Sequence, residues 1–185
     1  MAERTVIVNS VSKSYSVTGW RVGWTIAPPA ITDGIRKVHD FLTVGAAAPL
    51  QEAAATALAF PRSYYAQLAA TYQRKRDTLL AILRGAGFGC LVPAGAYYIM
   101  CDIAPLGYED GDALTMHLIT EVGVAPVPGS SFFHEPAHGR RFVRFAFPKR
   151  DETFDEVRAR LARLRPRAGA SGPARGRTSS SRRPG

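Results

Sequence analysis

Short β-branched or aromatic runs alternate with helix-length segments along most of this chain, and that alternation is the strongest constraint on its fold. The helix-length segments carry apolar residues at spacings of three and four, which is the helical period. Strands that alternate with helices are typical of α/β domains. Strands are expected at residues 5–8, 19–27, 96–103, 122–127 and 142–147, and helices at 31–42, 49–60, 63–84, 112–121 and 151–164. We therefore predict an α/β fold.

Pro61 divides the chain into two candidate domains, 1–60 and 61–164. Hydrophobic residues make up 46% of the sequence and charged residues 21%, so most of the chain is expected to form a packed core. The final segment, 165–185, is rich in Gly, Pro, Ser and Arg and has too few apolar residues to fold. We expect a disordered arginine-rich tail there.

The net charge of +9 is unevenly distributed. Six arginines and no acidic residues lie in the segment 165–185, and subtracting these six charges leaves +3 for the rest of the chain. Arginine attracts phosphates weakly and in a salt-dependent manner. The distribution therefore favours a solvated tail over a specific nucleic-acid partner.

Three absences in the sequence bear on its location. No apolar run reaches the ~18–20 residues that span a bilayer. The N-terminus lacks the basic-then-apolar layout of a signal peptide. Cys90 and Cys101 do not have a metal-ligand spacing. We expect a cytoplasmic protein with no membrane partner, in which both cysteines are small core residues.

A lysine just after the first expected strand is the main candidate for chemistry. Lys13 follows the run 5–8 across a polar turn that contains Ser10 and Ser12, and Arg21 comes eight residues later. A lysine just beyond a buried strand is partly desolvated, which favours the neutral amine that attacks a carbonyl. Serine and arginine donate the hydrogen bonds that a phosphate ester requires. A lysine amine that can react with an aldehyde, next to hydrogen-bond donors for a phosphate, describes a pyridoxal 5'-phosphate site.

Taken singly, Lys13 and Arg21 are better explained as a solvated loop lysine and an ion-paired arginine, but the full string reverses this. The sequence SVSKSYSVTGWRVG at residues 10–23 resembles, position by position, the cofactor-attachment motif of class I/II aminotransferases, the fold-type-I pyridoxal-phosphate enzymes. The likeness covers about residues 4–164 and is closest to the aspartate/kynurenine-type branch. Further stretches that carry it are 41–44, 49–53, 93–98, 127–132 and 143–147.

The resemblance implies a fold, an activity and an assembly. Residues 1–60 would be a remnant of the large cofactor domain, and residues 61–164 the small C-terminal domain. The activity implied is transamination between an amino acid and a 2-oxo acid, in a homodimer. Lys13 would hold the cofactor as a Schiff base and then move the proton between the substrate and the cofactor. Ser10 and Arg21, with Ser12 as a weaker candidate, would hold the phosphate.

The same resemblance assigns one substrate-binding residue in the second domain, Arg144, and two tyrosines are separate candidates. Arg144 would bind the α-carboxylate through two parallel hydrogen bonds, with Phe145 and Phe147 framing it. Tyr97 or Tyr98 would line the substrate pocket, although tyrosines in an apolar strand more often belong to a core.

One departure from the family leaves alternatives open. Family members carry a long segment upstream of the lysine that supplies the acid for the pyridinium nitrogen and the aromatic residue on the ring. Neither residue can be assigned in this sequence, so we expect a chain that lacks part of the cofactor site. A β-lyase on the same scaffold, and a non-catalytic remnant or regulatory domain, are the alternatives to transamination.

The segment HEPAH at residues 134–138 spells a zinc-protease pattern. That chemistry needs both histidines on one face of a continuous helix. Pro136 interrupts such a helix and Gly139 follows at once. We expect a loop there and no metal site.

Overall fold

The computed structural model describes residues 1–166, and these form two compact units, Met1–Leu68 and a second unit that begins at Ala69. Residues 167–185, and with them nearly all of the predicted tail, lie outside the described residues. The division falls inside a long helix, α3 (Arg62–Gly85), whereas the domain boundary was predicted at Pro61, one residue before that helix begins. None of the helices within residues 1–166 is both long and apolar enough to cross a bilayer.

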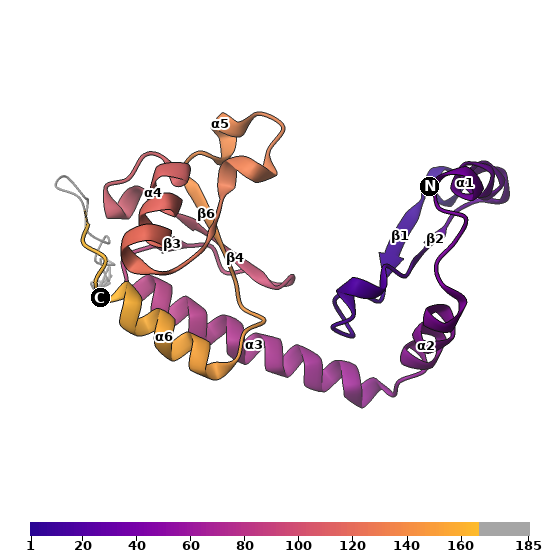
Figure 1. The fold of residues 1–185 in the computed structure, drawn as a ribbon, viewed down its shortest axis with the longest axis horizontal. Helices are drawn as coiled ribbons and strands as arrows, with labels where there is room; N and C mark the ends of the chain where they lie inside the picture. The colour runs from indigo at the N-terminus through magenta and orange to yellow at the C-terminus, as the bar shows by residue number, and fades with distance from the viewer. Residues whose placement is uncertain (167–185) are drawn as a thin grey trace, which may run out of the picture. The chain divides into compact units, whose positions relative to one another are not determined.

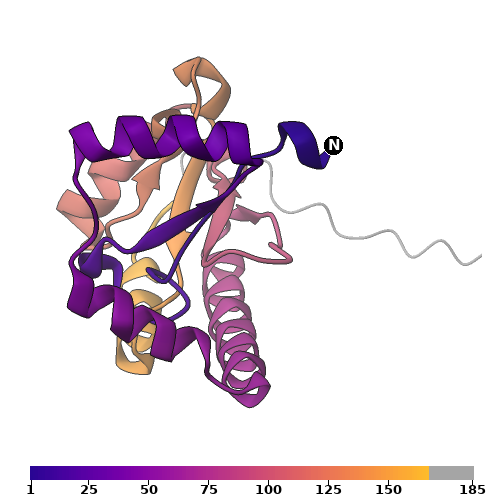
Figure 2. The same cartoon turned by 90° about the vertical axis from the view of Figure 1, so that its right-hand side faces the viewer.

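The first unit contains a β-hairpin followed by two helices (Figures 1 and 2). Strands β1 (Ile7–Ser10) and β2 (Gly23–Ile26) are antiparallel, with Ile7 opposite Ile26 and Ser10 opposite Gly23. Two helices follow, α1 (Pro29–Leu42) and α2 (Ala48–Leu58). Within residues 1–68 the buried core is only Val11, Val22 and Ala54, with partly buried side chains around it.

Two predictions for this unit are wrong. The first strand was expected to be buried at 5–8, but β1 begins two residues later and all four of its residues are exposed. Its only partner among residues 1–166 is β2, so little covers its faces. The second strand was expected at 19–27, but a 3-10 turn (Thr18–Trp20) and the left-handed backbone of Arg21 precede β2, because the chain must reverse direction before it can pair with β1.

The second unit is built on a four-stranded antiparallel sheet of order β3-β4-β6-β5. These strands are β3 (Gly89–Cys90), β4 (Tyr98–Asp102), β5 (Val127–Pro128) and β6 (Phe142–Ala146). The helices are the C-terminal part of α3, α4 (Gly111–His117), α5 (Pro136–Gly139) and α6 (Asp151–Leu161). Shorter turns lie at Ala2–Arg4 in the first unit and at Ala104–Leu106, Leu118–Val122 and Gly129–Phe132 in the second.

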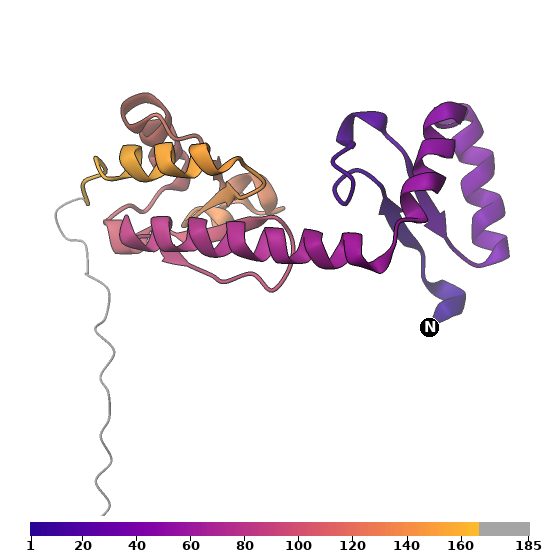
Figure 3. The same ribbon diagram turned by 90° about the horizontal axis from the view of Figure 1, so that it is seen from below.

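The core of the second unit lies between this sheet and two adjacent helices, α3 and α6 (Figures 1 and 3). Leu83 of α3, Ile99 of β4 and Val143 of β6 are fully buried in it.

Arg74 of α3 pairs with Asp151, the first residue of α6, at 3.0 Å. Acidic residues begin α6 and arginines end it, which matches the helix dipole as predicted.

One local prediction for this unit is wrong as well, and one strand was missed. The run 122–127 was expected to be a strand, but a single π-helical turn occupies Leu118–Val122, and β5 contains only Val127 and Pro128. Gly123, with φ of 78°, ends the turn. The short edge strand β3 was not predicted, since two residues carry no periodicity.

Candidate functional site

The segment that carries Lys13 is a tight turn at the end of the hairpin. The backbone N–H of Tyr15 donates to the carbonyl of Val11, and that of Val17 donates to the carbonyl of Ser12. Val11 is fully buried and Ser12 is 7% exposed, so the turn is anchored from its first residues. Lys13 itself is exposed, which contradicts the expected partial desolvation, because its strand β1 is uncovered.

Aromatic side chains contact the turn at Ser14 and Tyr15. The Tyr64 hydroxyl of α3 donates to the carbonyl of Ser14 at 2.6 Å. The Tyr15 ring stacks on Tyr64 and meets Phe60 edge-on. A hydrogen bond to the Tyr65 hydroxyl, with some burial, raises the pKa of Tyr15 to about 12. All these residues belong to the first unit. Sequence reasoning missed them, because three aromatics 45 or more residues further along carry no local signal.

The three predicted phosphate ligands come together. Ser10, Ser12 and Arg21 line one open hollow of about 480 Å³ at the end of the hairpin where β1 and β2 meet the turn. One Arg21 guanidinium nitrogen donates to the carbonyl of Thr18 at 3.0 Å. An arginine carries five N–H donors, so others remain for an anion. Hydroxyl and guanidinium donors of this kind suit a phosphate ester.

The hairpin at this end depends on a glycine. A Cβ atom at Gly23 would lie 2.6 Å from the backbone oxygen of Asn9 and 3.1 Å from the Cβ of Ser10. These distances are closer than real Cβ contacts, so Gly23 lets β2 approach the strand that carries Ser10.

Three further polar residues of the hollow, all on α1, were not predicted. Arg36 and His39, on the same face of α1, line it together with Asp40. Their spacing of three residues on a helix was the available signal. Arg21 and His39 also line a larger neighbouring hollow of about 780 Å³, which extends to Gln51 on α2.

The predicted carboxylate-binding arginine lies in the second unit, in the middle of β6. The guanidinium of Arg144 lies 4.0 Å from the ring centre of Phe132 and 4.9 Å from that of Tyr98. Arginine stacks in this way on aromatic faces. No acidic side chain among residues 1–166 forms an ion pair with Arg144. Its charge is therefore available to an anionic ligand.

The aromatic residues around Arg144 differ from the predicted ones. Phe145 and Phe147 were expected to frame it, but they are buried in the core, at 5% and 2% exposure, because neighbours in a strand alternate between faces. Tyr97 packs against the core and meets Tyr98 edge-on, so Tyr98 is the tyrosine that contacts Arg144.

The two histidines of the HEPAH segment do not share a helix. α5 begins at Pro136, so His138 is helical while His134 precedes the helix. The segment was predicted to be a loop, and this single turn of helix is a small correction. Within residues 1–166, no group of three or more His, Cys, Asp or Glu side chains is arranged to hold a metal ion.

The family model of class I and II aminotransferases matches residues 1–161. The chain belongs to this family. The predicted family and fold class are therefore confirmed, and so is the cofactor, because the fold-type-I aminotransferases depend on pyridoxal 5'-phosphate.

The chain is also similar to named aminotransferases. It is 37% identical over 173 residues to a probable N-succinyldiaminopimelate aminotransferase of Mycobacterium tuberculosis, a match that covers 89% of this chain and 43% of the relative. It is 36% identical over 185 residues to the kynurenine–oxoglutarate transaminase of Dictyostelium discoideum, covering 89% of this chain and 42% of that protein.

Solved structures of aminotransferases are also similar to this chain. The N-succinyldiaminopimelate aminotransferase of Mycobacterium tuberculosis superposes with a TM-score of 0.84 at 37% identity, covering 89% of this chain and 43% of that one. A variant of Thermus thermophilus aspartate aminotransferase gives a TM-score of 0.77 at 28% identity, covering 88% and 44%. This aminotransferase chain thus spans less than half the length of the relatives it matches.

Proposed function

We propose that this chain supplies the cofactor lysine and the substrate arginine for transamination between an amino acid and a 2-oxo acid. The observation that carries the proposal is the meeting of Ser10, Ser12 and Arg21 at one hollow, beside the turn on which Lys13 lies. The family match over residues 1–161 supports the reaction class.

The first unit would hold the cofactor. Ser10 and Arg21, with Ser12 in support, would donate hydrogen bonds to the phosphate, and Lys13 would supply the amine that holds the aldehyde. When bound, pyridoxal 5'-phosphate supplies an electron sink for the pair left on the substrate α-carbon. Val11 and Ser12 are buried, so the backbone of the turn that carries Lys13 is anchored.

Lys13 would also move the proton. Its Nζ would take the proton from the substrate α-carbon as a general base and give it up again as a general acid. A lysine serves both steps because the same amine is neutral before the transfer and charged after it.

Arg144 would bind the substrate α-carboxylate. Its planar guanidinium offers two parallel N–H donors, and contact with Phe132 and Tyr98 restricts the rotation of that plane. Binding the carboxylate at a fixed orientation aligns the α-carbon–hydrogen bond for abstraction. By analogy with the family, we also propose that the active form is a homodimer in the cytoplasm.

Labelling tests the central assignment. The protein is incubated with pyridoxal 5'-phosphate, reduced with borohydride and mapped by peptide mass. The chain contains four lysines, Lys13, Lys37, Lys75 and Lys149, so each serves as an internal reference. We expect the label on Lys13, and its loss in Lys13→Ala.

Lys37→Ala is the matched control. Lys37 lies in the same unit, is 74% exposed and pairs with Asp33 at 2.7 Å. Its removal should leave the Lys13 label unchanged. Equal or greater labelling of Lys37 in the unsubstituted protein would refute the proposal.

A further inference from the structure

Cys90 and Cys101 form a close pair on neighbouring strands. They lie directly opposite each other in the β3–β4 ladder, and their sulfur atoms are 3.4 Å apart. The backbone N–H of Leu91 donates to the carbonyl of Met100, so the cysteines occupy a non-hydrogen-bonded position of the ladder. From the sequence they are expected only to be small core residues, because a separation of eleven residues gives no sign of cross-strand pairing.

The backbone geometry suits a disulfide. At non-hydrogen-bonded positions the Cα atoms are about 4.5 Å apart and the side chains lie closer together than at other positions. That spacing falls within the range of about 4.4–6.8 Å found for disulfides. The sulfur atoms must approach by a little over 1 Å to reach a bond length of about 2.05 Å, which side-chain rotation can supply.

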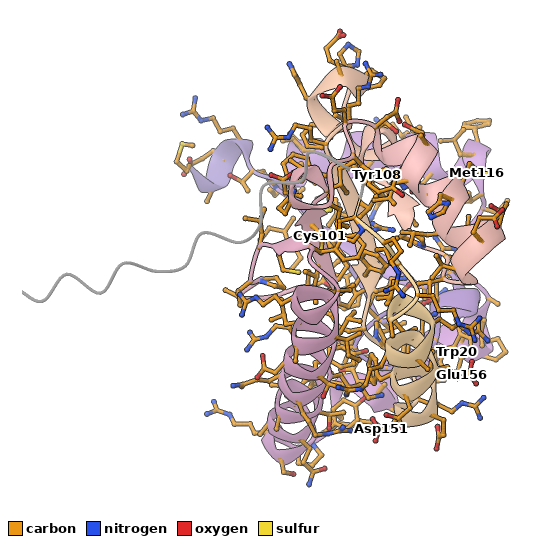
Figure 4. The ribbon with its side chains drawn as sticks, turned by 90° about the vertical axis from the view of Figure 1, so that its left-hand side faces the viewer. Trp20, Cys101, Tyr108, Met116, Asp151 and Glu156 are labelled. Carbon is orange, nitrogen blue, oxygen red and sulfur yellow. The ribbon has the colours of Figure 1, made fainter. Side chains whose placement is uncertain are left out.

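The two thiols differ in accessibility. Cys101, labelled in Figure 4, is fully buried in the core on β4, whereas Cys90 is partly exposed on β3, the edge strand of the sheet. A reagent from solution therefore meets Cys90 first, and Cys101 lies behind it within reach of its sulfur.

The thiols also differ in reactivity. The hydrogen bond from the Cys101 thiol lowers the pKa of Cys90, and the charge of Arg84 acts in the same direction against the effect of burial. The same hydrogen bond and burial raise the pKa of Cys101. Cys90 is thus the better nucleophile of the pair, because the thiolate is the reactive form.

We propose that Cys90 and Cys101 are a reversible dithiol–disulfide site that reacts with small-molecule disulfides. The Cys90 thiolate attacks one sulfur of the reagent, a mixed disulfide forms, and the first thiolate of the reagent leaves. The Cys101 thiol loses its proton to solvent and attacks the Cys90 sulfur, which forms the intramolecular bond and releases the second thiolate. The two cysteines lose two electrons and the reagent gains them. This site is independent of the transamination site.

Glutathione disulfide is the probe, applied to the full chain. After the reaction, free thiols are alkylated without reduction, and the protein is measured by intact mass and peptide mapping. We expect the protein to lose two hydrogen atoms, with a linked peptide that contains both cysteines, no retained glutathione and full recovery by dithiothreitol. A persistent glutathione adduct on Cys90 with Cys101 still alkylatable would overturn the proposal, as would disulfide-linked chains or no reaction.

Single variants assign the roles. Cys101→Ala should stop at the mixed disulfide on Cys90, and Cys90→Ser should leave Cys101 unreacted. The opposite pattern, with Cys101 accumulating the adduct, would contradict the order of attack. The linked peptide in the unsubstituted protein decides the proposal even where a variant fails to fold.

Discussion

The guanidinium carbon of Arg144 lies 4.0 Å from the centre of the Phe132 ring, and this contact brings β6 and the turn after β5 together around one positive charge. The ring restricts the guanidinium plane without neutralising it. An arginine held in this way is prepared for a planar anion such as a carboxylate.

Arg144→Lys should therefore weaken substrate use and leave cofactor attachment intact. Lysine keeps the charge but loses the planar fork. In a form of the enzyme that turns over amino acids, we expect kcat/KM to fall by roughly 100-fold, about 3 kcal/mol of transition-state binding. Arg141→Lys is the control, since Arg141 is 61% exposed and pairs with Asp102. Unchanged kinetics in Arg144→Lys, or loss of the cofactor, would contradict the assignment.

Gly23→Ala should destabilise the hairpin. The added methyl would meet the Asn9 oxygen at 2.6 Å, and overpacking of this kind costs typically about 1–3 kcal/mol. The two tryptophans of the chain, Trp20 and Trp24, both lie in the first unit, so denaturation followed by tryptophan fluorescence reports this unit alone.

The matched control is Gly19→Ala. A Cβ at Gly19 has no neighbour within 4 Å, so its midpoint should stay close to that of the unsubstituted chain. Equal midpoints for the two variants would show that the close approach at Gly23 does not matter.

Asp110 should make the second unit less stable in acid. It caps α4, and hydrogen bonds from the backbone N–H groups of Ala113 and Asp112, with the Arg140 guanidinium nearby, hold its pKa below the ordinary 3.8. A lowered carboxyl pKa stabilises the folded state above the unfolded value, and that contribution disappears as the pH falls through the folded value. In Asp110→Asn, which still caps the helix, urea midpoints followed by circular dichroism should lose this part of their pH dependence below 3.8. Identical acid profiles would refute it.

The 185-residue chain by itself should not sustain transamination. Val8 is 77% exposed and Ile26 58%, and a hairpin with so little cover is marginal in water. Exposed apolar strands also favour association. The check is a purified, dialysed sample assayed with several amino acids and 2-oxoglutarate. Steady turnover that disappears in Lys13→Ala would contradict this prediction.

The elements that were well predicted from the sequence are those in which a helical or strand periodicity of apolar residues is clear. The helix expected at 63–84 is observed at Arg62–Gly85, and the strand expected at 142–147 at Phe142–Ala146. Apolar residues recur at helical spacings in the first, and burial alternates along the second. β1 and β5 were misplaced, since their positions depend on pairing with distant strands and not on their own residues.

The candidate site follows the same rule. Ser10, Ser12, Lys13 and Arg21 were predicted from one continuous motif, and the structure brings Ser10, Ser12 and Arg21 to one hollow. The partners of Arg144 were predicted from its neighbours in sequence, and the structure supplies Phe132 and Tyr98 instead. Contacts between segments far apart in sequence are not encoded in local spacing.

The contrast between three buried core residues in the first unit and twenty in the second, within residues 1–166, has a consequence for exchange of amide hydrogens with deuterium. Amides exchange through local opening, and the free energy of opening rises with the apolar contacts that must break. The amides of β1 and β2 should exchange long before those of β4, which pairs on both edges. Protection should therefore be weaker in the two strands of the hairpin than in the strand that carries Cys101.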